Sequence, residues 1–110
     1  MVLPEALSTA CTSVGQSHYL GDSYEGTTLS SVARRDVVYL VSDDSPTGTN
    51  NFYMSYVDNA GNHVAQVGYT GEPEHGNTIY LPKGYAIRVQ CMDSGTNIKF
   101  HYLRMRSHDF

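Results

Sequence analysis

Apolar and polar positions alternate with a period of two along most of the chain. The clearest case is "YAIRVQCM" (85–92), in which successive side chains fall into two sets. One set is Ile87, Val89 and Cys91, and the other is Ala86, Arg88 and Gln90. Because neighbouring side chains of a strand point to opposite faces, this pattern predicts a strand with its first set buried and its second set outward.

Similar patterns predict further strands, and no segment keeps a helical period long enough to predict a substantial helix. The clearer ones are 37–42, 52–57, 63–69, 78–81 and 97–105, and weaker ones are 13–21 and 27–33. The segment "VLPEALS" (2–8) is compatible with one helical turn. In "FYMSYV" (52–57) we expect Tyr53 and Ser55 to face water.

Turn residues separate these strands. "DNAGN" (58–62) predicts a hairpin with a left-handed glycine, and Pro82-Lys83-Gly84 predicts a turn between two paired strands. "DSGT" (93–96) predicts another hairpin. The stretch "IYLPKGYAIRV" (79–89) resembles the strand–Pro-x-Gly–strand hairpin of many extracellular β-sandwiches, including carbohydrate-binding ones, but this generic resemblance transfers no site residues.

Short strands with frequent turns predict an all-β fold. We expect one antiparallel β-sandwich of about seven strands, with a small closed β-barrel as the alternative. Residues 1–110 fit a single domain, since domains typically contain about 100–150 residues. Residues 1–12 are expected to be a less regular N-terminal segment that Cys11 ties down.

The chain has two cysteines, Cys11 and Cys91, and neither belongs to a zinc-type spacing. We predict that they form a disulfide, with a buried free thiol at Cys91 as the alternative. A bridge across this loop contributes roughly 4–5 kcal/mol in the chain-entropy description. It also predicts an oxidising compartment, so we expect a secreted protein whose leader was removed ahead of Val2.

Composition and charge narrow the range of possible binding partners. A net charge of −4 disfavours general nucleic-acid binding, and no run of about 18 apolar residues predicts a membrane span. The chain is tyrosine-rich, with nine tyrosines and no tryptophan, which suits half-buried sheet positions and contact surfaces.

Candidate ligand-binding residues lie in two polar loops and on one predicted hairpin. The loop "SDDSPTGTNN" (42–51) supplies Asp43, Asp44, Asn50 and Asn51, and the loop "TGEPEHGN" (70–77) supplies Glu72, Glu74 and His75. On the hairpin, Tyr53 and Tyr69 are expected to form an aromatic platform for sugar rings or a partner protein. We expect no cofactor; the metal alternative is a calcium or zinc ion at Glu72, Glu74 and His75.

No motif for catalysis stands out. The sequence has no G-x-S-x-G segment and no phosphate-binding glycine loop, and Cys91 belongs to the buried set of its strand. We therefore expect a non-enzymatic, secreted binding protein whose partner is a glycan or a cell surface. The first alternative is an exported protein-binding inhibitor or toxin-like effector that presents the loop 42–51. The second is a self-assembling structural component.

Overall fold

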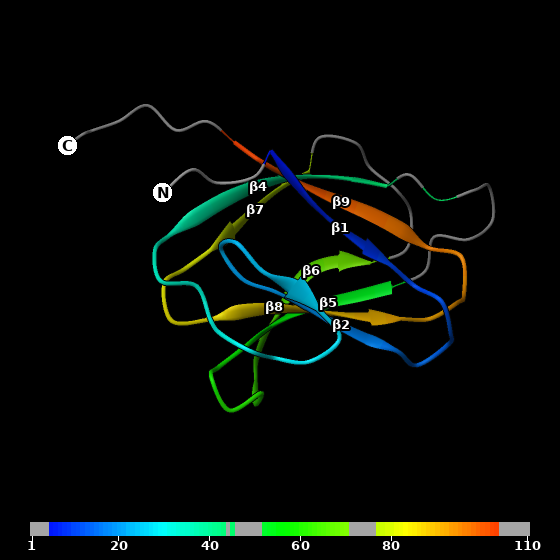
Figure 1. The fold of residues 1–110 in the computed structure, drawn as a ribbon, viewed down its shortest axis with the longest axis horizontal. Coiled ribbons are helices and arrows are strands. Elements are labelled where there is room, and N and C mark those ends of the chain that lie inside the picture. The colour runs from blue at the N-terminus through cyan, green and yellow to red at the C-terminus, as the bar shows by residue number, and fades with distance from the viewer. Residues whose placement is uncertain (1–4, 44, 46–51, 71–76, 104–110) are drawn as a thin grey trace.

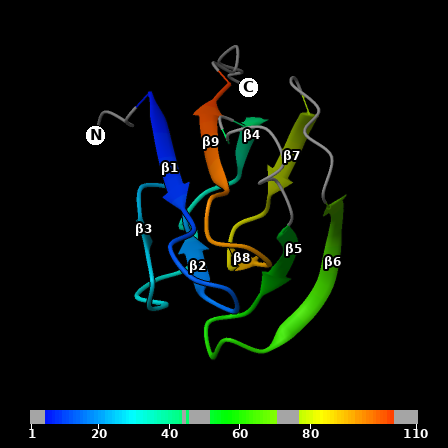
Figure 2. The ribbon, with the colours of Figure 1, turned by 90° about the vertical axis from the view of Figure 1, so that its right-hand side faces the viewer.

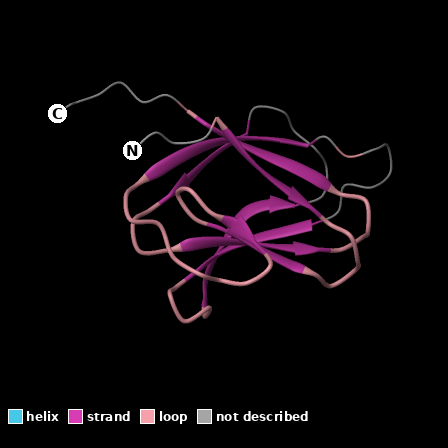
Figure 3. Cartoon of the chain, in the orientation of Figure 1, coloured by secondary structure: helices cyan, strands magenta, loops and turns pink. Residues whose placement is uncertain are grey.

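The computed structural model describes residues 5–43, 45, 52–70 and 77–103, which form two antiparallel β-sheets facing each other (Figure 1). The strands are β1 (Ala6–Ala10), β2 (Ser17–Leu20), β3 (Glu25–Gly26), β4 (Val37–Asp43), β5 (Phe52–Val57), β6 (His63–Thr70), β7 (Asn77–Leu81), β8 (Ala86–Cys91) and β9 (Asn97–Tyr102). The described residues form no helix, and hence none of a length and apolarity that would cross a membrane (Figure 3). The prediction of an all-β sandwich is confirmed.

The strand order shows how the two layers are built (Figure 2). One sheet has four strands in the order β1-β9-β4-β7, and the other has five in the order β3-β2-β8-β5-β6. Except within the β2–β3 and β5–β6 pairs, each strand is followed by a strand of the opposite sheet. This alternation is a double-sheet jelly roll with β3 as an additional edge strand. No described strand pairs across the two sheets, so the closed-barrel alternative is wrong.

Two of the three connections predicted to be hairpins instead join the two sheets. The turn after β7 forms as expected, because the Tyr85 N–H donates to the Pro82 carbonyl (3.3 Å) and Gly84 has φ +94°. However, β7 pairs with β4, whereas β8 pairs with β2 and β5. The turn after β8 likewise leads to β9 in the opposite sheet. Turn residues determine the local bend but not the partner of the next strand.

The third connection, residues 58–62, is a true hairpin between β5 and β6. Gly61 has φ +84°, the left-handed conformation expected for this turn. The Asp58 carboxylate accepts hydrogen bonds from the backbone N–H groups of Ala60 (3.0 Å) and Asn62 (2.9 Å). The backbone bond from Asn62 is the main reason that the pKa of Asp58 is lowered. This hairpin connects β5 to the edge strand β6.

The N-terminal third departs most from the predictions. Residues 6–10 form β1, which pairs with β9, although the segment 2–8 was compatible with one helical turn. Ala, Leu and Glu favour helices locally, but pairing with a neighbouring strand overrides so weak a preference. Residues 27–33 form no strand; instead Ala33 exchanges backbone hydrogen bonds with Tyr85 (2.8 Å) and Gly84 (2.9 Å). With β1 and the short β3, the described residues form nine strands rather than about seven.

The core lies between the sheets and takes its side chains from both. As the alternation predicted, Ile87, Val89 and Cys91 of β8 are fully buried. Tyr39 of β4 is also fully buried and packs edge-on against Phe100 of β9, with ring centroids 5.8 Å apart. The core cluster comprises Leu20, Ala33, Val37, Tyr39, Val41, Phe52, Met54, Ile79, Leu81, Ile87, Val89, Ile98 and Phe100.

Tyrosine hydroxyl groups connect the two layers. Tyr39 and Tyr102, both in the four-stranded sheet, donate hydrogen bonds to backbone carbonyls in the loop after β2 of the five-stranded sheet. Tyr56 of β5 donates in the opposite direction, to the Tyr80 carbonyl on β7. Burial raises the pKa of all three hydroxyls, which keeps them neutral donors. These bonds hold the sheets in a fixed relative position.

The predicted disulfide is present. Cys11 and Cys91 are bonded, with their Cα atoms 5.7 Å apart, and both are buried. Backbone bonds surround the bridge, because the Cys11 N–H donates to Thr96 (2.8 Å) and the Cys91 N–H donates to Gln16 (2.7 Å). The bridge therefore joins the segment after β1 to the end of β8, and the free-thiol alternative is wrong.

Replacing both cysteines, C11A/C91A, is expected to lower the free energy of unfolding by about 2–5 kcal/mol. Without the bridge, the unfolded chain regains the conformational entropy that closing an 80-residue loop removes, while the packing of the folded core changes little. Urea denaturation monitored by circular dichroism measures the difference. S13A, in the exposed loop beside the bridge, serves as the control and should change stability by less than about 0.5 kcal/mol. Equal stability of C11A/C91A and wild type would contradict the prediction.

Candidate functional site

Most of the predicted ligand-binding side chains lie outside the residues that the structure describes. These are Asp43, Asp44, Asn50, Asn51, Tyr69, Glu72, Glu74 and His75, although the backbones of Asp43 and Tyr69 belong to β4 and β6. The metal alternative at residues 72–75 therefore also lies outside the described residues. The same holds for most of the loop 42–51, which the inhibitor alternative would present. Within the described part, no three His, Cys, Asp or Glu side chains gather as a metal site requires.

Tyr53 is the predicted site residue whose side chain the structure shows. It lies on β5, points away from the core and is 46% exposed. In register it is opposite the exposed Gln90 of β8, which is opposite Ser17 of β2. Tyr53, Gln90 and Ser17 therefore form one row across the outer face of the five-stranded sheet.

Arg88 occupies the centre of the adjacent row. Two residues before Gln90 on β8, it is opposite Tyr19 of β2 and Ser55 of β5. Ser55 was expected to face water, but it is only 8% exposed. Its small side chain stands between the longer side chains at its two register partners, Arg88 and Gln66, which shield it. We call the two rows together, Ser17, Tyr19, Tyr53, Ser55, Arg88 and Gln90, the Tyr53 face.

The opposite end of the same outer surface is covered. Val57 and Ala86 are register partners that point outward, yet both are fully buried. Ala86 was expected to be exposed, and the segment between β3 and β4 explains why it is not. A Cβ on Gly61 would lie 3.8 Å from Leu29 of that segment, and Ala33 bonds to Tyr85 beside Ala86. On the Tyr53 face, by contrast, Tyr53 and Gln90 are exposed, and Arg88 is half-buried.

The predicted partnership of Tyr53 with Tyr69 stays a prediction. In the backbone register Tyr53 is opposite Thr70 rather than Tyr69. The pairing of β5 with β6 is irregular between the pairs Tyr53–Thr70 and Ser55–Gln66. On its other side Tyr53 is opposite Gln90 of β8.

The Tyr53 face combines groups that suit the recognition of a polar ligand. The Tyr53 ring offers a flat apolar surface with a hydroxyl at its tip. The Gln90 amide supplies donors and an acceptor, and the Arg88 guanidinium supplies a planar set of donors with a positive charge. The backbones of β5 and β8 are hydrogen-bonded on both sides, so these side chains rise from a rigid surface.

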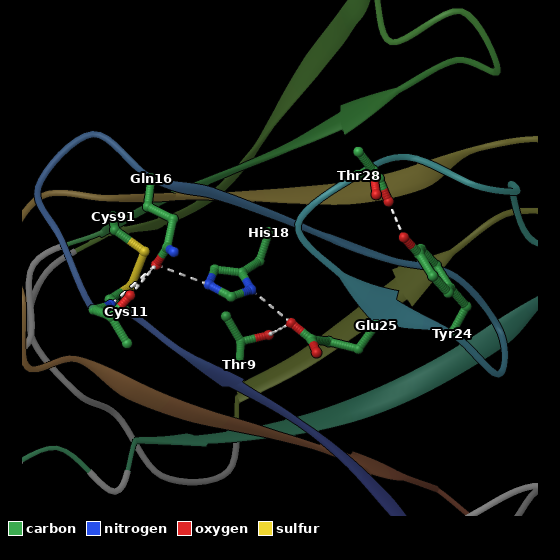
Figure 4. Close-up of polar contacts among 9 residues, drawn as sticks. Thr9, Cys11, Gln16, His18, Tyr24, Glu25, Thr28 and Cys91 are labelled. Carbon is green, nitrogen blue, oxygen red and sulfur yellow. Dashed lines mark hydrogen bonds and ion pairs between the residues drawn. A yellow bond between two sulfur atoms is a disulfide. The ribbon is translucent and has the colours of Figure 1, made fainter.

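A second polar group lies between the sheets at the edge formed by β1, β2 and β3 (Figure 4). His18 of β2 is 8% exposed, and its Nδ1 lies 2.7 Å from Oε2 of Glu25 on β3. Its Nε2 lies 3.1 Å from Oε1 of Gln16, beside the disulfide. Thr9 of β1 donates to the same Glu25 oxygen over a longer distance of 3.5 Å.

The hydrogen-bond pattern fixes the roles of these atoms. The Gln16 atom that faces His18 also accepts the backbone N–H of Thr12 (3.0 Å), so it is the amide oxygen. The Nε2 of His18 must therefore donate. Its Nδ1 faces the Glu25 carboxylate, and the two side chains form an ion pair when His18 is protonated and Glu25 is ionised. Both ring nitrogens are engaged within the protein, so the group ties β2 to β3 and to the loop that carries Cys11.

Sequence patterns did not reveal His18, Glu25, Arg88 or Gln90 as members of polar groups. The alternation of β8 placed Arg88 and Gln90 outward, but it did not show that β5 is the neighbouring strand. Glu25 lies in a two-residue strand, which is too short for any periodic signal.

Comparisons with known proteins add no further identification. No protein-family model, curated protein sequence or solved structure gives a significant match to this chain.

Replacing Glu25 by glutamine is expected to lower the free energy of unfolding by about 1–3 kcal/mol, because buried His18 loses its anionic partner. E5Q makes the same chemical change at an exposed position and should alter stability by less than about 0.5 kcal/mol. Urea denaturation of both variants measures the difference. If E25Q is as stable as E5Q, the His18–Glu25 pair does not hold this edge of the sandwich.

Proposed function

We propose that this protein is a secreted binding protein that holds a glycan or another surface polymer against the Tyr53 face. The observation that carries the proposal is the placement of a 46% exposed tyrosine opposite an exposed amide, with a guanidinium in the adjacent row, on the outer face of one sheet. Sugar rings present apolar faces and several hydroxyl groups, and these side chains match both.

The disulfide supports export. Structural disulfides form and persist in oxidising compartments and are rare in reducing ones. The bridge between Cys11 and Cys91 is buried and joins the two sheets, so it is part of the fold rather than an exposed reactive pair.

We propose binding rather than catalysis. His18, which is 8% exposed and lies 2.7 Å from Glu25, is a candidate general base by its residue type. A general base needs a ring nitrogen within reach of a proton on a reacting group. Both His18 nitrogens already face Glu25 and Gln16, which supports a structural role for this pair.

A glycan array with the purified protein tests the proposal, followed by calorimetry on the best binder. Y53A is expected to weaken binding about tenfold, because the stacking surface is removed. Y80A is the matched control: Tyr80 is 50% exposed but lies on β7 in the other sheet. Binding by wild type that Y53A and Y80A weaken equally would contradict a site on the Tyr53 face, and no binding to any glycan would contradict the proposal.

One observation favours self-association as a second candidate function. β6 is an edge strand that pairs with β5 alone among the described strands. Its residues 63–66 are exposed, including Val64 at 48%, and its sequence contains no lysine, proline or acidic residue. Edge strands commonly carry such residues because they block pairing with another chain. An unprotected edge of this kind suits antiparallel pairing with β6 of a second copy.

Light scattering after size-exclusion chromatography tests this second function. We expect a dimer whose dissociation is concentration-dependent, and we expect V64K to shift it to monomer by placing a charge in the shared edge. V14K, in the exposed loop between β1 and β2, is the control and should leave the dimer intact. A monomeric wild type at all concentrations would rule out assembly through this edge.

A further inference from the structure

Arg88 has an unusual position on the Tyr53 face. It lies on β8, the middle strand of the five-stranded sheet, and points outward between Tyr19 of β2 and Ser55 of β5. Strands on both sides therefore hold the stem of this side chain at the centre of the surface.

The Nε atom of Arg88 is buried and has no hydrogen-bond partner among the described residues. A buried N–H without an acceptor is unfavourable, because it has lost water and gained nothing in exchange. Most buried polar groups in proteins are satisfied, so such an exception calls for a physical reason. A ligand that supplies an acceptor to this N–H, with a small outward shift of the guanidinium, would remove the penalty on binding.

The charge around Arg88 favours an anionic acceptor. The strands β2, β5, β6 and β8 contain no Asp or Glu. Among the described strands of this sheet, the acidic residue is Glu25 of β3, and its carboxylate points between the sheets toward His18. The outward positions next to Arg88 are instead hydroxyl and amide side chains. The guanidinium is thus a positive charge that the described strands of its own sheet leave uncompensated.

Tyr53 and Gln90 lie within reach of the same ligand. Residues two apart on a strand are separated by about 7 Å, which is the spacing from Arg88 to Gln90 along β8. Tyr53 is directly opposite Gln90. A sugar ring stacked on Tyr53 would therefore extend a substituent over the guanidinium in the adjacent row.

We propose that Arg88 binds the anionic group of an acidic glycan, a carboxylate or a sulfate, while the sugar ring stacks on Tyr53. The inference rests on the proposed function and specifies its ligand class. Guanidinium and carboxylate or sulfate oxygens form paired, charge-assisted hydrogen bonds, and Nε–H belongs to one edge of that fork.

Binding to paired acidic and neutral glycans tests the inference. The probes are oligogalacturonate with its methyl ester, and dextran sulfate with unmodified dextran. We expect binding to at least one acidic member, with its neutral counterpart about tenfold or more weaker, and the two pairs distinguish carboxylate from sulfate. R88Q is expected to reduce the acidic affinity about tenfold to a hundredfold, and R88K to reduce it less.

R34Q is the matched control, because it changes net charge equally at an exposed arginine outside the Tyr53 face. Equal losses in R88Q and R34Q would show general electrostatic attraction and overturn the inference. Equal binding of acidic and neutral glycans, unchanged in R88Q but weakened in Y53A, would overturn the role of Arg88 while preserving the proposed function. Absence of binding to every glycan would overturn both.

The Arg88 Nε–H signal in a ¹⁵N–¹H spectrum provides a direct readout. Titration with the bound acidic oligosaccharide should shift this signal and slow its exchange with water, because the buried N–H acquires an acceptor. An unchanged signal at saturating ligand would contradict the contact even if the affinity of R88Q were reduced.

Discussion

The covalent link between Cys11 and Cys91 is the constraint around which this sandwich is organised. Cys91 ends the middle strand of the five-stranded sheet, and Cys11 directly follows the edge strand of the other sheet. Beside the bridge, Gln16 accepts the backbone of Thr12 and the ring of His18, so the covalent and polar links form one connected unit. The tyrosine hydroxyls fasten the layers elsewhere, at the loop after β2 and at β7.

A jelly roll needs such links because its chain changes sheet at most connections. Hydrogen-bonded ladders hold strands within a layer, but only packing and side-chain bonds act between layers. The protein supplies these bonds mainly with tyrosine, whose ring fills the core and whose hydroxyl reaches a carbonyl in the opposite layer. The tyrosine-rich composition therefore reflects the architecture, while Tyr53, which points outward, is one of the tyrosines available for another purpose.

Local patterns predicted those parts of the fold that are locally determined. The burial of Ile87 and Val89 and the hairpin around Gly61 follow from periodicity and turn chemistry. Strand partners could not be predicted, because β8 pairs with strands that lie far from it in the sequence. The same limit applied to the candidate site. Tyr53 was identified from its own strand, but its association with Arg88 required the β5–β8 register, and the shielding of Ser55 followed from that register too.

The pairing of β1 with β9 also determines when the protein can fold. A growing chain emerges from the ribosome with its N-terminal residues first, and domains generally fold as units. Residues 6–10 obtain their backbone partners only after residues 97–101 have been made, and Cys11 must wait equally for Cys91. Closure of the sandwich and formation of the disulfide therefore both wait until β8 has been made.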